Sequence, residues 1–145
     1  MRTQLTARRR RAVLAVAIGA IALDTALLGL IAPLLPDIES RIGATDAELG
    51  LALGAYALPI IVVSLPLGRL ADVVGRRPLL LGGMLLTVAG SLLIAFADSL
   101  PVLVSGRAVQ GVGSAASWIA ALALVSELAP RGELGAHAFH ERRPR

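Results

Sequence analysis

Two charged residues lie inside long apolar stretches of the sequence. Asp24 interrupts the run from Ala12 to Leu35, and Arg107 interrupts the run from Val102 to Ser126. If these runs cross a bilayer, a charge near its centre costs at least about 2.5–3.5 kcal/mol, so such residues usually serve a function. A carboxyl group there is short of hydration and could bind and release a proton or attract a cation. Asp24 and Arg107 are therefore candidate residues of a proton or substrate pathway.

The estimated depths of these two charges are similar. Asp24 lies about twelve residues, or ~18 Å, into its run, and Arg107 lies about six residues, or ~9 Å, into a run of opposite direction. In a hydrocarbon core of ~30 Å the two depths then differ by only ~3 Å. We therefore expect the residues to be partners, with Arg107 biasing the protonation of Asp24 or of a bound ligand. Two simpler interpretations remain: Asp24 as a hydrogen-bonding residue in helix packing, and Arg107 reaching outward to the membrane surface.

A third group of charges lies between two apolar runs, in the segment Gly68–Leu80. This segment contains Arg69, Asp72, Arg76 and Arg77. Gly68 and Gly75 permit turns that a Cβ would hinder. Pro78 suits the start of a helix, where its missing N–H has no intrahelical partner. The segment is thus predicted to be the tight connection of a transmembrane hairpin.

The composition indicates that lipid surrounds most of the chain. Of the 145 residues, 56% are hydrophobic, and the mean hydropathy is +0.77, whereas soluble domains average about 45–50% apolar residues. The net charge of +4 comes from arginines that flank apolar runs, which argues against nucleic acid as a partner. The absence of cysteine excludes disulfides, thiol catalysis and cysteine-based zinc sites.

We therefore predict an all-α membrane protein with four transmembrane helices. The expected spans are about 12–35, 47–67, 79–97 and 101–126, within a membrane domain at 12–129 that is flanked by basic termini at 1–11 and 130–145. Thr45 and Glu48 form a capping-box pattern at the start of the second span, and Pro59 should kink it. A signal peptide is an alternative for the first run, which is nevertheless long enough for a full span.

Small residues mark faces on which helices could approach closely. Gly50 and Gly54 form a Gly-x-x-x-Gly pattern in the second span, and Gly111 and Gly113 lie in a stretch of the fourth span rich in Gly, Ala and Ser. Such residues let helix backbones pack against each other in membranes. We expect these four glycines to serve helix packing.

The arginines in the connections predict the orientation. Twelve arginines fall in the N-terminus, the second connection and the tail, against one in the first connection and none in the third. Because basic residues gather on the cytoplasmic side, both termini are expected to be cytoplasmic. The tail is expected to be disordered. Its His137 and His140 are spaced to share a helical face, but two ligands are weak evidence for a metal site.

Three motifs resemble those of the major facilitator superfamily of secondary transporters, in the same order and at similar spacing. Gly68 to Arg77 resembles the signature that joins the second and third spans. The segment Leu23–Leu28, followed by Pro33 and Pro36, is similar to the first-span motif of proton-coupled drug and vesicular amine antiporters. The segment Leu103–Gly113 is similar to the fourth-span motif.

The resemblance implies roles for particular residues. Asp24 would handle a proton or a cation, Arg107 would take part in proton coupling, and Asp72 would help to latch the cytoplasmic side with the neighbouring arginines. The energy source would be a proton gradient rather than a cofactor. The fold implied is part of the N-terminal half of a transporter that has twelve or fourteen spans in two halves.

The leading functional hypothesis is a piece of a proton-coupled exporter of drugs or organic cations that works by alternating access. The fifth span, whose motif marks antiporters, is not in the sequence, so the expectation of export rests on the resemblance alone. A truncated or frameshifted product is one interpretation of the arginine-rich ending. Transport should need the missing C-terminal spans or a homo-oligomer. The alternatives are a non-transporting remnant or membrane-interaction subunit, and a small homo-oligomeric exporter in the cell membrane. No combination of nucleophile, base and orienting group indicates an enzyme.

Overall fold

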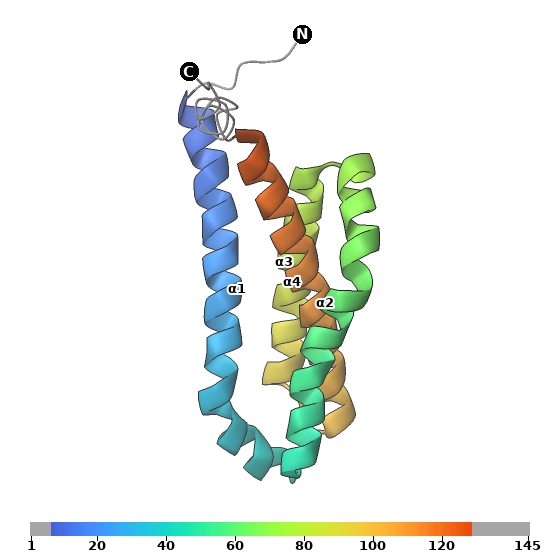
Figure 1. Ribbon diagram of the computed structural model, residues 1–145. Coiled ribbons are helices and arrows are strands. Elements are labelled where there is room, and N and C mark those ends of the chain that lie inside the picture. Colours follow the sequence, from blue (N-terminus) through green and yellow to red (C-terminus); the bar gives the residue numbers. More distant parts are fainter. Residues whose placement is uncertain (1–6, 129–145) are drawn as a thin grey trace, which may run out of the picture.

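The computed structural model describes residues 7–128, which form four helices joined by short turns (Figure 1). They are α1 (Ala7–Ile42), α2 (Asp46–Val74), α3 (Arg76–Ala95) and α4 (Leu100–Leu128). Each helix is long and apolar enough to cross a membrane. Successive helices run in opposite directions, so the start of α1, the α2–α3 turn and the end of α4 lie at one end of the bundle (Figure 1). The prediction of an all-α fold with four long apolar helices is confirmed.

Helix α4 is the centre of the bundle and packs against the other three helices, most extensively against α3. Small residues permit this close packing. A Cβ built on Gly90 would lie 2.6 Å from the backbone nitrogen of Gln110, and one built on Gly113 would lie 2.5 Å from the backbone nitrogen of Thr87. Real Cβ atoms do not approach so closely, so α3 and α4 could not keep this spacing with larger residues.

Two features set the helix boundaries around α2. The hydroxyl of Thr45 accepts a hydrogen bond from the backbone N–H of Glu48, whose carboxylate accepts one from the backbone N–H of Thr45 at 2.8 Å. This is the capping box that the sequence predicts. At the other end, Gly75 has a φ of +98°, which L-residues with a Cβ rarely adopt, and it reverses the chain between α2 and α3.

The first helix is longer than the sequence predicts. It continues from the expected end near residue 35 through Pro33 and Pro36 to Ile42, and it begins at Ala7, within the expected basic terminus. The reason lies in packing: Ile38 is only 3% exposed and belongs to an apolar cluster with Leu49 and Leu103. The prolines therefore fall inside the helix, and the connection expected between the spans at about 12–35 and 47–67 is reduced to residues 43–45.

The predicted connection at 68–80 is also mostly helical. Helix α2 continues through Gly68 and Asp72 to Val74, and α3 begins at Arg76, so Gly75 alone makes the turn. The expectation that Gly68 also serves as a turn residue is wrong. The kink expected at Pro59 agrees with Figure 1, in which α2 changes direction about midway along its length.

The two glycine pairs differ in their surroundings. An added Cβ at Gly111 would collide with the carbonyl oxygen of Tyr56, so α2 and α4 approach each other closely there, and Gly113 lies against α3. By contrast, no atom lies within 4 Å of a Cβ built on Gly50 or Gly54. Among residues 7–128, the Gly-x-x-x-Gly face therefore packs against no other helix.

Candidate functional site

Asp24 is buried where α1 packs against α4. Its side chain is 7% exposed. The same carboxylate oxygen, Oδ2, accepts a hydrogen bond from Ser114 Oγ at 2.6 Å and another from Trp118 Nε1 at 2.9 Å. Ser114 and Trp118 are one helical turn apart on α4, so both side chains reach the same partner. Two donors thus compensate in part for the loss of water around this carboxylate.

Arg107 is still more deeply buried, at 2% exposure, and it also belongs to α4. Its guanidinium carbon lies 4.5 Å from the centroid of the Tyr56 ring, which is a cation–π geometry. Its Nη1 donates a hydrogen bond to Gln110 Oε1 at 2.5 Å, and Gln110 Nε2 donates to Ser91 Oγ on α3 at 3.1 Å. Nε of Arg107 has no hydrogen-bond partner in the part of the chain that the structure describes. The arginine therefore points into the bundle rather than outward to a membrane surface.

Asp24 and Arg107 do not form the direct pair that their depths suggest. The single ion pair in the described segment 7–128 joins Arg76 to Glu127. Tyr56 of α2 lies between the two buried charges: its ring faces Arg107, and its hydroxyl lies 2.8 Å from Ser114 Oγ. Asp24 lies level with Ser114 and Trp118, which follow Arg107 on α4 by seven and eleven residues, or about 10–16 Å along the helix. The expectation of similar depths is therefore wrong, because α1 continues past its expected end to Ile42.

A groove of about 320 Å³ opens beside Asp24. Its walls come from α1, α2 and α4, and its polar lining includes Asp24, Tyr56, Ser114 and Trp118. Its size is at the lower end of the range for small-molecule sites. One carboxylate, two aromatic rings and the hydroxyls of Thr25 and Ser114 in a largely apolar groove suit a ligand that is both cationic and apolar.

Sequence reasoning missed Tyr56, Gln110 and Trp118 as members of this site. Ser114 belongs to the Gly-, Ala- and Ser-rich stretch of the fourth span, which was expected to serve helix packing. A signal was present. Arg107, Gln110 and Ser114 follow one another at spacings of three and four residues, which places polar side chains on one face of an otherwise apolar helix. This pattern predicts a polar stripe inside the bundle.

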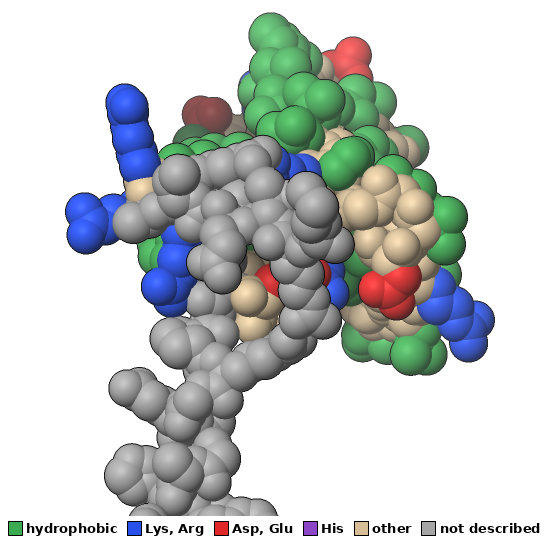
Figure 2. All heavy atoms as spheres, turned by 90° about the horizontal axis from the view of Figure 1, so that it is seen from above, with side chains coloured by type: hydrophobic (Ala, Val, Ile, Leu, Met, Phe, Trp, Pro, Cys, Tyr) green, Lys and Arg blue, Asp and Glu red, His purple; other side chains and the backbone are tan. Residues whose placement is uncertain are grey.

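The residues of the predicted cytoplasmic gate gather at the end of the bundle where α1 begins and α4 ends. Figure 2 views this end and shows basic side chains around its rim. Arg76 pairs with Glu127 at 2.6 Å and donates to the carbonyl oxygen of Ala123 at 2.8 Å, so it ties the start of α3 to the end of α4. Asp72 and Arg77 are exposed and line the same hollow of about 420 Å³, together with Gly75.

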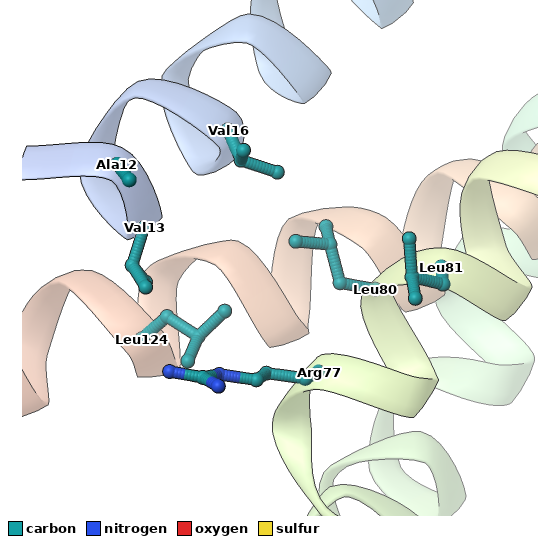
Figure 3. Close-up of a pocket in the computed structure, with 7 residues that line it drawn as sticks. All are labelled: Ala12, Val13, Val16, Arg77, Leu80, Leu81 and Leu124. Atoms are coloured by element: carbon teal, nitrogen blue, oxygen red, sulfur yellow. The ribbon is translucent and has the colours of Figure 1, made fainter. Parts of the chain in front are cut away.

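Arg77 also borders an apolar pocket of about 260 Å³ between α1, α3 and α4. Figure 3 shows its side chain extending toward Leu124, with Val13 of α1 on the facing side. The other lining residues are Ala12, Val16, Leu80 and Leu81. His137, His140 and the predicted disordered tail lie outside the described residues.

Comparison with known protein families decides the identity of the fold. The family model described as Major Facilitator Superfamily matches residues 12–137. The chain belongs to the major facilitator superfamily. Superfamily membership and four long apolar helices together make it a multi-pass membrane protein of a transporter family.

Several curated superfamily transporters are similar to this chain. Inner membrane transport protein YajR of Escherichia coli (strain K12) is 43% identical over 86 residues, which cover 59% of this chain and 18% of YajR. Multidrug resistance protein MdtL of Shewanella sp. (strain ANA-3) is 33% identical over 105 residues, which cover 72% of this chain and 25% of MdtL. An uncharacterized transporter of Schizosaccharomyces pombe, C18.02, is 34% identical over 146 residues, which cover 93% of this chain and 32% of the relative. The chain thus spans less than a third of the length of these superfamily relatives.

Proposed function

We propose that this superfamily chain serves proton-coupled efflux of drugs or organic cations by alternating access. The observation that carries the proposal is the Asp24 carboxylate, which lines an open groove together with two aromatic side chains, Tyr56 and Trp118. A buried carboxylate attracts a cation, and aromatic ring faces add to that attraction. The resemblance to MdtL, named as a multidrug resistance protein, supports the same substrate class.

The same carboxylate would couple export to protons. When Asp24 is ionised, it attracts the cation, and when it is protonated, this attraction is lost. A proton and a cation would therefore compete for one site, and a proton gradient would supply the energy without a cofactor. In a chain that alternates access, each would be released on the side where the other is abundant.

The groove needs a second wall to enclose a substrate. Transporters of this class bind substrate near the midplane between two repeats. We propose that further C-terminal spans, or a second copy of this chain, supply the opposite wall. Because the residues that line the groove come from α1, α2 and α4, this wall would lie against these three helices.

The gate and the orientation complete the proposal. Asp72, Arg76 and Arg77 would hold the cytoplasmic side closed in one state, with Gly68 and Gly75 part of the same motif. The arginine excess at this end of the bundle would face the cytoplasm of a cell membrane, together with both termini.

The test is binding of ethidium, a fluorescent aromatic cation, by the purified chain in lipid nanodiscs. We expect saturable binding that weakens as the pH falls, because protons compete for Asp24. Asp24→Asn should lower the affinity at least tenfold. Asp37→Asn is the matched control, because Asp37 is an exposed carboxylate on the same helix, and it should bind ethidium like the wild type.

Equal ethidium affinity in Asp24→Asn and Asp37→Asn would refute the assignment of Asp24 as the cation site. Transport is a separate measurement, made on liposomes that contain the chain and carry a pH gradient. Accumulation of ethidium that requires Asp24 would support a homo-oligomeric exporter. Binding without transport would indicate that further spans are needed, and neither binding nor transport would favour a non-transporting membrane-interaction subunit.

A further inference from the structure

Tyr56 contacts both buried charges of the site, one directly and one through Ser114. Its ring carries the guanidinium of Arg107 on one face. Its hydroxyl bonds Ser114 Oγ at 2.8 Å, and Ser114 Oγ donates to Asp24 Oδ2 at 2.6 Å. We infer that Tyr56 is a positioning residue through which Arg107 stabilises the ionised form of Asp24 without touching it. The inference deepens the proposed function and rests on it for the role of Asp24 as the titrating group.

The direction of the hydrogen bonds follows from the number of protons. The Ser114 hydroxyl has one proton, and the bond to the Asp24 carboxylate uses it. The Tyr56 hydroxyl must therefore donate to Ser114, which accepts. Both bonds point their protons toward the carboxylate. The two hydrogen bonds in series, from Tyr56 to Ser114 and from Ser114 to Asp24, therefore favour a negative charge on Asp24.

Arg107 strengthens this arrangement through the tyrosine ring. A cation over the ring face draws electron density from the ring and makes the hydroxyl a better donor. Hydrogen bonds in series polarise one another, so a stronger bond from Tyr56 to Ser114 strengthens the bond from Ser114 to Asp24. The positive charge of Arg107 thus acts on Asp24 from a distance.

Other ionisable groups do not compete for this role among residues 7–128. The ionisable side chains near Asp24 are Tyr56 from α2 and, on the far side of the tyrosine ring, Arg107 from α4. The small hollow on the α3 side of Asp24 is lined from α3 by Met84, Thr87 and Val88, which do not titrate. The path through Tyr56 is therefore the connection between the two charges that the described residues provide.

Trp118 makes the inference testable without any transport assay. It is the one tryptophan in the sequence, and its indole N–H donates to Asp24 Oδ2. The fluorescence of Trp118 should therefore change when Asp24 gains or loses its proton. The measurement is the fluorescence of the full chain in lipid nanodiscs as a function of pH.

We expect a transition in the wild type that is absent in Asp24→Asn. Tyr56→Phe keeps the ring that Arg107 covers but removes the hydroxyl, and it should move the transition to higher pH by about half to one pH unit, which corresponds to the loss of one hydrogen bond. Ser114→Ala should move it in the same direction. Because Tyr56 acts through Ser114, adding Tyr56→Phe to Ser114→Ala should cause no further shift.

A Tyr56→Phe variant with the wild-type transition would overturn the inference, as would full additivity of the two substitutions. A transition that persists in Asp24→Asn would overturn the contact between Trp118 and Asp24 on which the inference depends. These results are independent of ethidium. Failure of ethidium to bind would count against the proposed function, while the fluorescence shift would still decide the role of Tyr56.

Discussion

Two neighbouring glycines on α3 allow a matched test of how closely α3 and α4 pack. A Cβ built on Gly83 would lie 2.7 Å from the carbonyl oxygen of Gly113 and 2.7 Å from the backbone nitrogen of Ser117. A Cβ built on Gly82 meets no atom within 4 Å. The substitutions Gly83→Ala and Gly82→Ala thus make the same chemical change in the same helix, and only one of them meets α4.

The expected difference follows from two opposing effects. Replacing glycine by alanine inside a helix favours the helix by about 0.5–1 kcal/mol, and this gain applies to both variants. Overpacking at a close contact costs about 1–3 kcal/mol. The close atoms at Gly83 include backbone, which cannot rotate away, so the full cost applies there. Gly82→Ala should therefore be slightly stabilised, and Gly83→Ala should be about 1–3 kcal/mol less stable than Gly82→Ala.

The assay is reversible unfolding of the chain in mixed detergent micelles, followed by the fluorescence of Trp118, with both variants compared with the wild type. Trp118 suits this purpose because it contacts α1 from α4 and should report the separation of the helices. Equal free energies of unfolding in the two variants would mean that α3 and α4 do not pack as closely as described. A destabilised Gly82→Ala would mean that its surroundings are not open.

Two further predictions concern the ends of the helices. Thr45→Ala removes the capping box with Glu48 and should lower the free energy of unfolding by about 0.5–2 kcal/mol in the same micelle assay, and an unchanged value would argue against the cap. Arg76→Gln breaks a partly exposed ion pair with Glu127, which should lower the free energy of unfolding by about 0.2–1 kcal/mol. It also removes a hydrogen bond to the carbonyl oxygen of Ala123, which should lower the free energy of unfolding further. Arg77→Gln, which has no ion pair among residues 7–128, is the control, and a larger loss in Arg77→Gln than in Arg76→Gln would contradict the contacts described at this end.

The sequence predicts the number and order of the helices well, because apolar runs of this length have few alternatives. It predicts their ends less well. Proline inside a helix normally argues for a boundary, yet the packing of Ile38 against Leu49 and Leu103 keeps α1 helical to Ile42. Similarly, charge in a segment indicates exposure but not the loss of helix, so α2 continues past Asp72 to Val74.

The charged residues of the site could be predicted from the sequence, but the contacts that link them could not. Asp24 and Arg107 are conspicuous because charges are expensive in lipid. Counting residues from the expected ends of the runs places them at similar depths, but α1 continues to Ile42, so Asp24 lies level with Ser114 and Trp118 rather than with Arg107. Gly111 lies close to the backbone of Tyr56, and the Tyr56 hydroxyl bonds Ser114, so both residues lie between the charges; residue counts do not predict such contacts between helices.

The central claim is that a buried carboxylate at Asp24 faces a groove that accepts either a proton or a cation. Modification by dicyclohexylcarbodiimide, which reacts with protonated carboxyl groups in apolar surroundings, tests this claim most directly. We predict that mass spectrometry of the chain in nanodiscs will find the modification at Asp24, increasing as the pH falls and decreasing at least several-fold with saturating ethidium. Modification of exposed carboxylates such as Asp37 in place of Asp24, or equal modification of Asp24 with and without ethidium, would contradict the account.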